Sequence, residues 1–153
     1  MRLTSFTDYA LRILLMAASH PDRLITISEI AETYDLSRGH VMKIVNLLSH
    51  EGILEAVRGR NGGLRLREDP AHINLGALVR LTEPDFKLAE CFGTPNNCLV
   101  SAYCKLPGPL NEALNAFLSA LDKFSLEDMM LKPSQFTGPQ PFNQPQRGPL
   151  LDQ

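Results

Sequence analysis

Three cysteines, Cys91, Cys98 and Cys104, are the residues of this sequence best suited to metal chemistry. They are the only cysteines in 153 residues, and six and then five residues separate them in a segment rich in Gly, Pro and Asn. Structural cysteines usually lie scattered through a hydrophobic core, whereas thiolates that bind a soft metal converge from one loop. The spacing therefore predicts a metal centre on residues 91–104, and an iron-sulfur cluster is the centre that we favour.

The three thiolates do not complete the four ligands of a zinc site or of a 4Fe-4S cluster. All four histidines lie upstream of the cysteines, and Pro107 occupies the third position after Cys104. The fourth ligand could come from Glu90, from a side chain elsewhere in a dimer, or from solvent. Structural zinc and three unligated thiols are the alternatives that the residues leave open.

No segment has the character of a signal peptide or a membrane span. Asp8 and Arg12 interrupt the first apolar segment and leave only Ile13 to Ala18 as an apolar run, far short of the roughly 18 apolar residues of a membrane span. Clustered cysteines in such a chain favour metal or redox chemistry in a reducing compartment over disulfide bonds. We therefore expect a cytoplasmic protein, with enough apolar residues (44%) to form a core.

Basic residues are concentrated between residues 37 and 67. This stretch holds six Lys and Arg against two Glu, a local balance of +4 in a chain of net charge -2, so the remainder carries -6. A basic face on an acidic body is typical of nucleic-acid binding. Without an accompanying binding motif, an ordinary solvated cluster of charges would explain the same local balance.

Such a motif is present, because two capped helices separated by a short turn are predicted here. Thr4 or Ser5 can cap a first helix with apolar positions at three- and four-residue steps. A capping box at residues 26–29 begins a second helix, and Ser37 begins a third that ends before Gly52. The outer face of the third helix offers small, polar and basic side chains suited to base edges and phosphates.

Two short strands, residues 53–57 and 64–67, follow the third helix and are joined by a glycine-rich, Asn-Gly hairpin. A helix-turn-helix followed by a basic hairpin is a winged helix, so we predict a fold that is mainly α with a small β-hairpin. The third helix would enter the major groove, and the hairpin tip would reach phosphates or the minor groove. The residues expected to contact DNA are Ser28, Ser37, Arg38, His40, Lys43, Arg58, Arg60, Asn61 and Gly62.

The remaining organisation follows from composition. A winged helix-turn-helix domain over residues 1–82, whose last helix is capped by Asn74, precedes the cysteine loop at residues 83–108. A predicted dimerisation helix over residues 109–131 carries a heptad seam, which suits a twofold partner on a palindrome but could equally pack inside one monomer. The seam consists of Leu110, Leu114, Phe117, Leu121 and Phe124. Residues 132–153, rich in Pro and Gln, are predicted to be a disordered tail.

An enzymatic function has little support in the sequence. The glycines between residues 59 and 63 lie in a hairpin, not between a strand and a helix where they would bind phosphate, and no Ser/His/Asp arrangement is apparent. We therefore predict a protein that is not an enzyme.

The combined motifs resemble the bacterial iron-sulfur winged-helix transcription regulators, the family that includes NsrR and IscR. The resemblance covers about residues 1–130 and is carried by residues 3–9, 37–40 and 57–63 together with the three cysteines. The chain is more similar to the nitric-oxide-sensing NsrR type than to IscR, whose pattern has a histidine three residues after the last cysteine. This chain has Pro107 at that position.

The resemblance implies a homodimer with one 4Fe-4S cluster per subunit, ligated by Cys91, Cys98 and Cys104. It also implies that Asp8 of the opposite subunit is the fourth ligand, whereas the sequence alone predicts a surface ion pair between Asp8 and Arg12. The implied function is repression at a palindromic operator while the cluster is intact, and release of the DNA when nitric oxide degrades it.

Two alternatives to this function are kept open. One is a regulator of iron-sulfur cluster assembly or of iron supply, which belongs to the same class. The other is an iron-sulfur electron carrier, which would not bind a specific DNA sequence; the predicted recognition helix and arginine-bearing hairpin argue against it.

Overall fold

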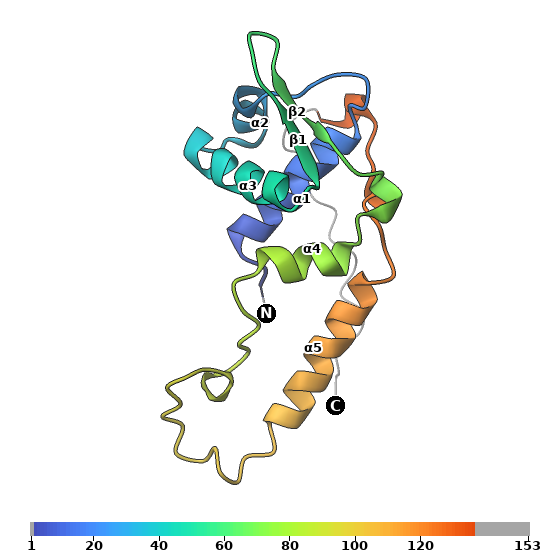
Figure 1. Cartoon of the computed structure of the whole chain (residues 1–153). Coiled ribbons are helices and arrows are strands. Elements are labelled where there is room, and N and C mark those ends of the chain that lie inside the picture. Colours follow the sequence, from blue (N-terminus) through green and yellow to red (C-terminus); the bar gives the residue numbers. More distant parts are fainter. Residues whose placement is uncertain (1, 137–153) are drawn as a thin grey trace.

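A computed structural model describes residues 2–136 of the chain. In this part of the chain, five α-helices and a two-stranded antiparallel sheet form a winged helix-turn-helix followed by an extended loop and a longer helix (Figure 1). The helices and strands are α1 (Ser5–Ala18), α2 (Ile27–Tyr34), α3 (Arg38–His50), β1 (Leu54–Val57), β2 (Gly63–Leu66), α4 (Leu75–Thr82) and α5 (Pro107–Leu121). Short 3-10 turns lie at Pro70–His72, Glu90–Phe92, Glu127–Met129 and Pro133–Gln135. The predicted fold class, mainly α with a small β-hairpin, is confirmed.

The N-terminal caps predicted for the first four helices are present. The side chains of Thr4 and Ser37 accept hydrogen bonds from backbone N–H groups in the first turns of α1 and α3, and Asn74 does the same for α4. Thr26 and Glu29 form the full capping box at the start of α2. Each cap satisfies a backbone donor that has no partner within the helix, and such a cap typically contributes about 1 kcal/mol.

The hydrophobic core is built around α1, which packs against α3, α4 and β2. Its apolar face is completely buried, with Ile13 and Leu14 at 0% exposure. Ile30 from α2 and Val41 from α3 reach the same cluster and are equally buried. Since α1 and α3 share this core, a displacement of α1 changes the packing of α3.

The β-hairpin forms where predicted, and the ends of its strands lie within one residue of the expected positions. Val57 pairs with Gly63, so residues 58–62 form the connecting loop. The positive backbone torsion in this loop is at Gly59 (φ 118°), a conformation that glycine adopts without steric cost. The turn is therefore a five-residue loop rather than a two-residue turn centred on Asn61-Gly62.

The C-terminal end of α5 differs from the prediction, because the helix ends at Leu121 instead of continuing to residue 131. The backbone leaves the helix where Asp122 accepts two hydrogen bonds from the guanidinium of Arg80, at 2.6 and 2.8 Å. The amide of Asn74 also donates to the Asp122 carbonyl at 2.8 Å. Phe124, which the heptad pattern assigned to the helix, consequently lies beyond its end and is 45% exposed.

The segment after α5 returns to the winged-helix core. Leu126 is completely buried there, and the backbone N–H of Leu131 donates to the hydroxyl of Ser19 at 3.3 Å. The predicted disordered tail begins at residue 132, yet Pro133–Gln135 form a 3-10 turn and the ring of Phe136 lies 5.6 Å from that of His20. Residues 137–153, which make up the rest of the predicted tail, lie outside the described residues.

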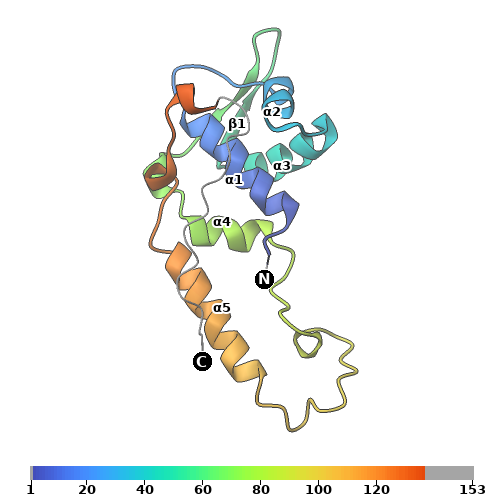
Figure 2. The ribbon, with the colours of Figure 1, turned by 180° about the vertical axis from the view of Figure 1, so that it is seen from behind.

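The cysteine loop and the N-terminal end of α5 extend away from the winged-helix body. Figures 1 and 2 show the loop leaving the end of α4, turning at the far end of the molecule, and returning through α5. Among the described residues, no helix is long and apolar enough to cross a membrane.

Candidate DNA interface and metal centre

The outer face of α3 presents the predicted recognition residues. Arg38, His40 and Lys43 are exposed, whereas Val41 and Ile44 on the opposite face are buried. Ser37 is also exposed, and its hydroxyl accepts a hydrogen bond from the backbone N–H of His40 at 3.3 Å. This hydroxyl therefore caps the N-terminus of α3. The helix thus offers a polar, basic face while its other face anchors it in the core.

The loop of the β-hairpin carries the predicted wing residues. Arg58, Arg60 and Asn61 are exposed, and Gly62 is half-buried. Ser28, in the first turn of α2, is also half-buried. The hairpin is joined to the chain before α2 by a bridge in which the N–H groups and carbonyls of residues 25 and 64 bond reciprocally, at 2.7 and 3.0 Å. The wing and the helix-turn-helix are therefore one connected unit.

Ion pairing divides the arginines of this region into two groups. Arg65 in β2 is paired with Glu55 in β1 at 2.7 Å, and this hydrogen bond lowers the pKa of Glu55. Within residues 2–136, Arg38, Arg58 and Arg60 take part in no ion pair, and neither does Lys43. Arg67, directly after β2, is likewise exposed and in no ion pair among these residues, so the positive charge available to a phosphate backbone lies on α3, at the wing tip and at the base of the hairpin.

The three cysteines lie at separate points of the extended loop. Cys91 is in the 3-10 turn at Glu90–Phe92, Cys98 follows an Asx turn in which Asn96 accepts from its backbone N–H at 3.0 Å, and Cys104 precedes α5. All three are free thiols of intermediate exposure. Soft, unoxidised sulfur donors on one loop fit the donor chemistry of an iron-sulfur cluster.

The loop of a single chain does not assemble a complete ligand set. Across residues 2–136, no three His, Cys, Asp or Glu side chains converge as they would around a metal ion. Glu90, one candidate for the fourth ligand, accepts a hydrogen bond from the backbone N–H of Asn97 at 3.2 Å. Asp8, the ligand that the family resemblance implies, is in the winged-helix body and forms an ion pair with Arg12 at 2.8 Å, as expected from the sequence alone.

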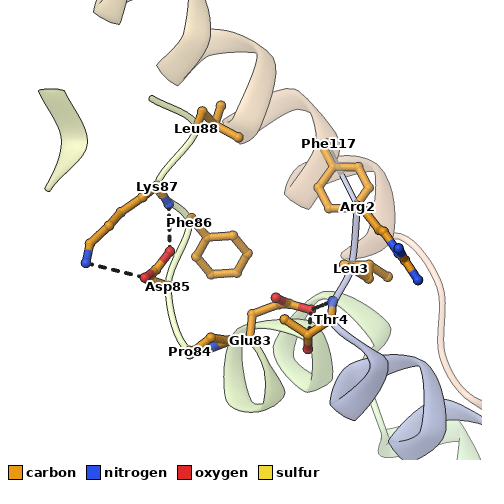
Figure 3. Close-up of a pocket in the computed structure, with 10 residues that line it drawn as sticks. All are labelled: Arg2, Leu3, Thr4, Glu83, Pro84, Asp85, Phe86, Lys87, Leu88 and Phe117. Carbon is orange, nitrogen blue, oxygen red and sulfur yellow. Dashed lines mark hydrogen bonds and ion pairs between the residues drawn. The ribbon is translucent and has the colours of Figure 1, made fainter. Parts of the chain in front are cut away.

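A residue that sequence reasoning missed, Glu83, connects the start of the cysteine loop to α1. Its carboxylate accepts hydrogen bonds from the backbone N–H and the hydroxyl of Thr4, at 2.8 and 3.1 Å. Figure 3 shows this contact at the edge of a cavity of about 300 Å³, which is bordered by Phe86 from the loop and Phe117 from α5. No local signal could have revealed it, because the two residues are 79 positions apart.

Comparison with known families decides the class of the protein. Residues 3–132 match the Rrf2 family, which is described as "Iron-dependent Transcriptional regulator". The chain belongs to the Rrf2 family. It is 48% identical over 132 residues to the HTH-type transcriptional regulator NsrR of Bacillus subtilis, covering 85% of this chain and 90% of that protein. The regulator of the same name from Bacillus licheniformis is 44% identical, with 86% and 93% covered.

Solved structures share the architecture of the chain. T. potens IscR superimposes with a TM-score of 0.67 at 21% identity, covering 84% of this chain and 85% of that one. The oxidised form of Staphylococcus aureus CymR gives 0.67 at 23% identity, with 84% and 95% covered. At these identities the likeness shows the fold, which confirms the predicted winged helix-turn-helix.

The Rrf2 protein is therefore a transcription regulator, as the sequence motifs predicted, and its fold is a DNA-binding one. The relatives named NsrR support the resemblance of the sequence to this type of regulator. The individual DNA contacts and cluster ligands stay predictions.

Proposed function

We propose that this Rrf2 protein is a homodimeric, nitric-oxide-sensing repressor whose iron-sulfur cluster controls operator binding. The observation that carries the proposal is the single loop, directly before α5, that holds three free thiols. Sequence identity of 41–48% to six regulators named NsrR supports nitric-oxide sensing as part of this function.

The proposed ligands are Cys91, Cys98 and Cys104 of one subunit and Asp8 of the partner subunit. Two features support this division: Asp8 lies on the winged-helix body, and the loop extends away from the body of its own chain (Figure 1). The Asp8 carboxylate is 44% exposed and bound only to another exposed side chain, so a second subunit can reach it. When bound, a 4Fe-4S cluster would supply iron sites open to a diatomic gas, and a hard carboxylate donor would be the most labile of its ligands.

The proposed link between sensing and DNA binding runs through α1. When the partner's loop binds Asp8, it restrains the position of α1. Because α3 packs on α1, the same contact restrains α3. When that engagement ends, Asp8 is free to re-form its ion pair with Arg12, seen here at 2.8 Å. The recognition helices of the two subunits then lose a common restraint on their spacing.

The proposed dimer contact is α5. Its heptad positions Leu110, Leu114, Phe117 and Leu121 are only partly buried within one chain, although Leu118 on the adjoining face is 8% exposed. A second copy of α5 would cover this partly exposed seam. A twofold dimer would also match the symmetry of a palindromic operator.

The proposed DNA contacts divide into two groups. Ser37, Arg38, His40 and Lys43 would lie in the major groove, with Ser28 beside them. Arg58, Arg60, Asn61 and Gly62 would contact phosphates or the minor groove. The exposure of the charged members and their lack of ion pairs among the described residues support this division.

An anaerobic titration tests the proposal. The purified dimer should show a broad absorption band near 400 nm and about four irons and four sulfides per chain, as expected for the clusters in this class. Stepwise nitric oxide should bleach the band and release an operator fragment in the same concentration range. Cys98→Ser is the matched control and should bind no stable cluster.

Each alternative has a distinct result in the same experiment. An intact cluster that is indifferent to nitric oxide while DNA binding is retained would favour a regulator of cluster assembly or iron supply. A cluster that cycles reversibly in a protein without sequence-specific DNA binding would favour an electron carrier. A colourless protein that cannot be reconstituted would refute the proposal outright.

A further inference from the structure

The segment between Cys98 and Cys104 exposes large apolar side chains. Leu99 is 100% exposed, Val100 is 60% exposed and Tyr103 is 91% exposed. Single exposed apolar residues are common on protein surfaces. Three within five residues of one loop form a patch that is typical of a surface covered by another molecule.

A cavity of suitable character lies between α1 and α3. It has a volume of about 250 Å³ and is lined by Ser5, Phe6, Tyr9, His40, Lys43 and Ile44. Phe6, Tyr9 and Ile44 make part of its lining apolar and aromatic, while Ser5, His40 and Lys43 contribute polar groups. A concave apolar site with a few polar groups suits an aromatic side chain that carries one hydroxyl.

The position of this cavity identifies the molecule that would cover it. Asp8 lies on α1 between Ser5 and Tyr9, both of which line the cavity. Arg12, the ion-pair partner of Asp8, lies 5.9 Å from the Tyr9 ring, so these side chains share one face of α1. A cysteine loop bound to Asp8 of the partner subunit would therefore lie directly beside the cavity.

We propose that Tyr103 of each subunit inserts into the α1–α3 cavity of its partner. This inference rests on the proposed dimer, in which Asp8 meets the partner's loop, and it adds a second contact at that meeting point. Tyr103 suits the cavity best among these exposed residues, because its ring matches the apolar part of the lining and its hydroxyl matches the polar part. Leu99 and Val100 have no polar group in their side chains.

The insertion would connect the cysteine loop directly to the recognition helix. His40 and Lys43 line the cavity and are also expected to contact DNA. An aromatic side chain beneath them would fix their positions relative to α1. The loop of one subunit would thereby influence the DNA-binding surface of the other through side-chain packing, in addition to the ligand bond at Asp8.

Photo-crosslinking of the full-length dimer tests this contact directly. A benzoylphenylalanine residue is introduced at position 103, and dimers are prepared from a mixture of isotopically light and heavy chains. Light-to-heavy crosslinks to residues 5–9 or 40–44 are expected. Crosslinks confined to one chain, crosslinks to other surfaces, or the absence of any crosslink would overturn the proposal.

Iron and sulfide content is measured in the same samples, so that the two proposals can fail separately. A crosslink to the partner's cavity in a protein that holds no cluster would support the docking and refute the proposed sensor. A normal cluster without this crosslink would leave the sensor intact and refute the docking.

A variant series supplies a functional readout. Loss of a central aromatic anchor commonly costs 2 kcal/mol or more, which is at least about 30-fold. For Tyr103→Ala, the ratio of operator affinities with and without the cluster should therefore fall by at least about 30-fold, with iron content unchanged. Tyr103→Phe should keep most of the ratio, and Leu106→Ala, another exposed residue of the same loop (55%), should keep all of it. An unaltered ratio in Tyr103→Ala would contradict the proposed coupling.

Discussion

The carboxylate of Glu83 accepts two hydrogen bonds from Thr4, the N-cap residue of α1. The backbone N–H of Thr4 donates at 2.8 Å and its hydroxyl donates at 3.1 Å. Glu83 directly follows α4 and begins the segment that leads to the cysteine loop, while Thr4 begins the helix that carries Asp8. The start of the cysteine loop and α1, the central helix of the winged-helix domain, are therefore joined by these two hydrogen bonds.

Replacing Glu83 should destabilise the fold measurably. Glu83→Ala removes two hydrogen bonds to a charged acceptor and leaves the backbone N–H of Thr4 without its partner, which should lower the free energy of unfolding by about 2 kcal/mol. Urea denaturation of the metal-free protein measures this change. Glu90→Ala, which removes one exposed hydrogen bond within the loop, should change the free energy by less than about 0.5 kcal/mol. Equal effects from the two substitutions would show that the Glu83 contact does not anchor α1.

The two groups of arginines in the hairpin should differ in DNA binding. Arg60→Ala removes an unpaired exposed cation and should reduce the slope of log affinity against log salt by about 1, as expected for one lost phosphate contact. Arg65→Ala removes the same charge from the same hairpin, but that charge is already paired with Glu55 at 2.7 Å, so the slope should change less. Fluorescence anisotropy on an operator fragment at several salt concentrations measures both slopes. Identical slopes would contradict the assignment of the wing tip as the phosphate contact.

Asp8 and Arg12 provide a matched pair for testing the fourth cluster ligand. Either Asp8→Ala or Arg12→Ala removes the same exposed i,i+4 ion pair, so each should cost the metal-free protein only about 0.3–0.5 kcal/mol. Only Asp8→Ala should also remove a cluster ligand. Its cluster should therefore lose iron faster under air than that of Arg12→Ala, as followed by the decay of the visible absorption. Equal decay rates in the two variants would exclude Asp8 as a ligand.

Local sequence rules were sufficient for the winged helix. The caps at Thr4, Thr26, Ser37 and Asn74 are all formed, because each cap is determined by residues within three positions of it. The strands of the hairpin were placed within one residue for the same reason. The exposed, basic face of α3 followed from the periodicity of its buried positions.

Contacts between distant residues could not be predicted in this way. The heptad steps continued through Phe124, but α5 ends at Leu121 because Arg80 binds Asp122 from another helix. The composition of residues 132–153 likewise predicted a disordered tail, although Phe136 packs beside His20. The contact of Glu83 with Thr4 also had no local signature. The candidate metal site was recognisable only as a cluster of cysteines, because its proposed fourth ligand lies in another subunit.

Tyr34 offers a pH-dependent test of the packing between α2 and α1. Its hydroxyl donates to the carbonyl oxygen of Arg12 at 3.0 Å, and burial raises the pKa of Tyr34 from 10.0 to about 12. Because the folded protein favours the neutral phenol, the stabilising contribution is complete below pH 10 and is lost as the pH rises towards 12. An ultraviolet titration of the metal-free protein should thus contain a tyrosinate step near pH 12 that is missing in Tyr34→Phe. Superimposable titration curves for the two proteins would show that Tyr34 is not held in this contact in solution.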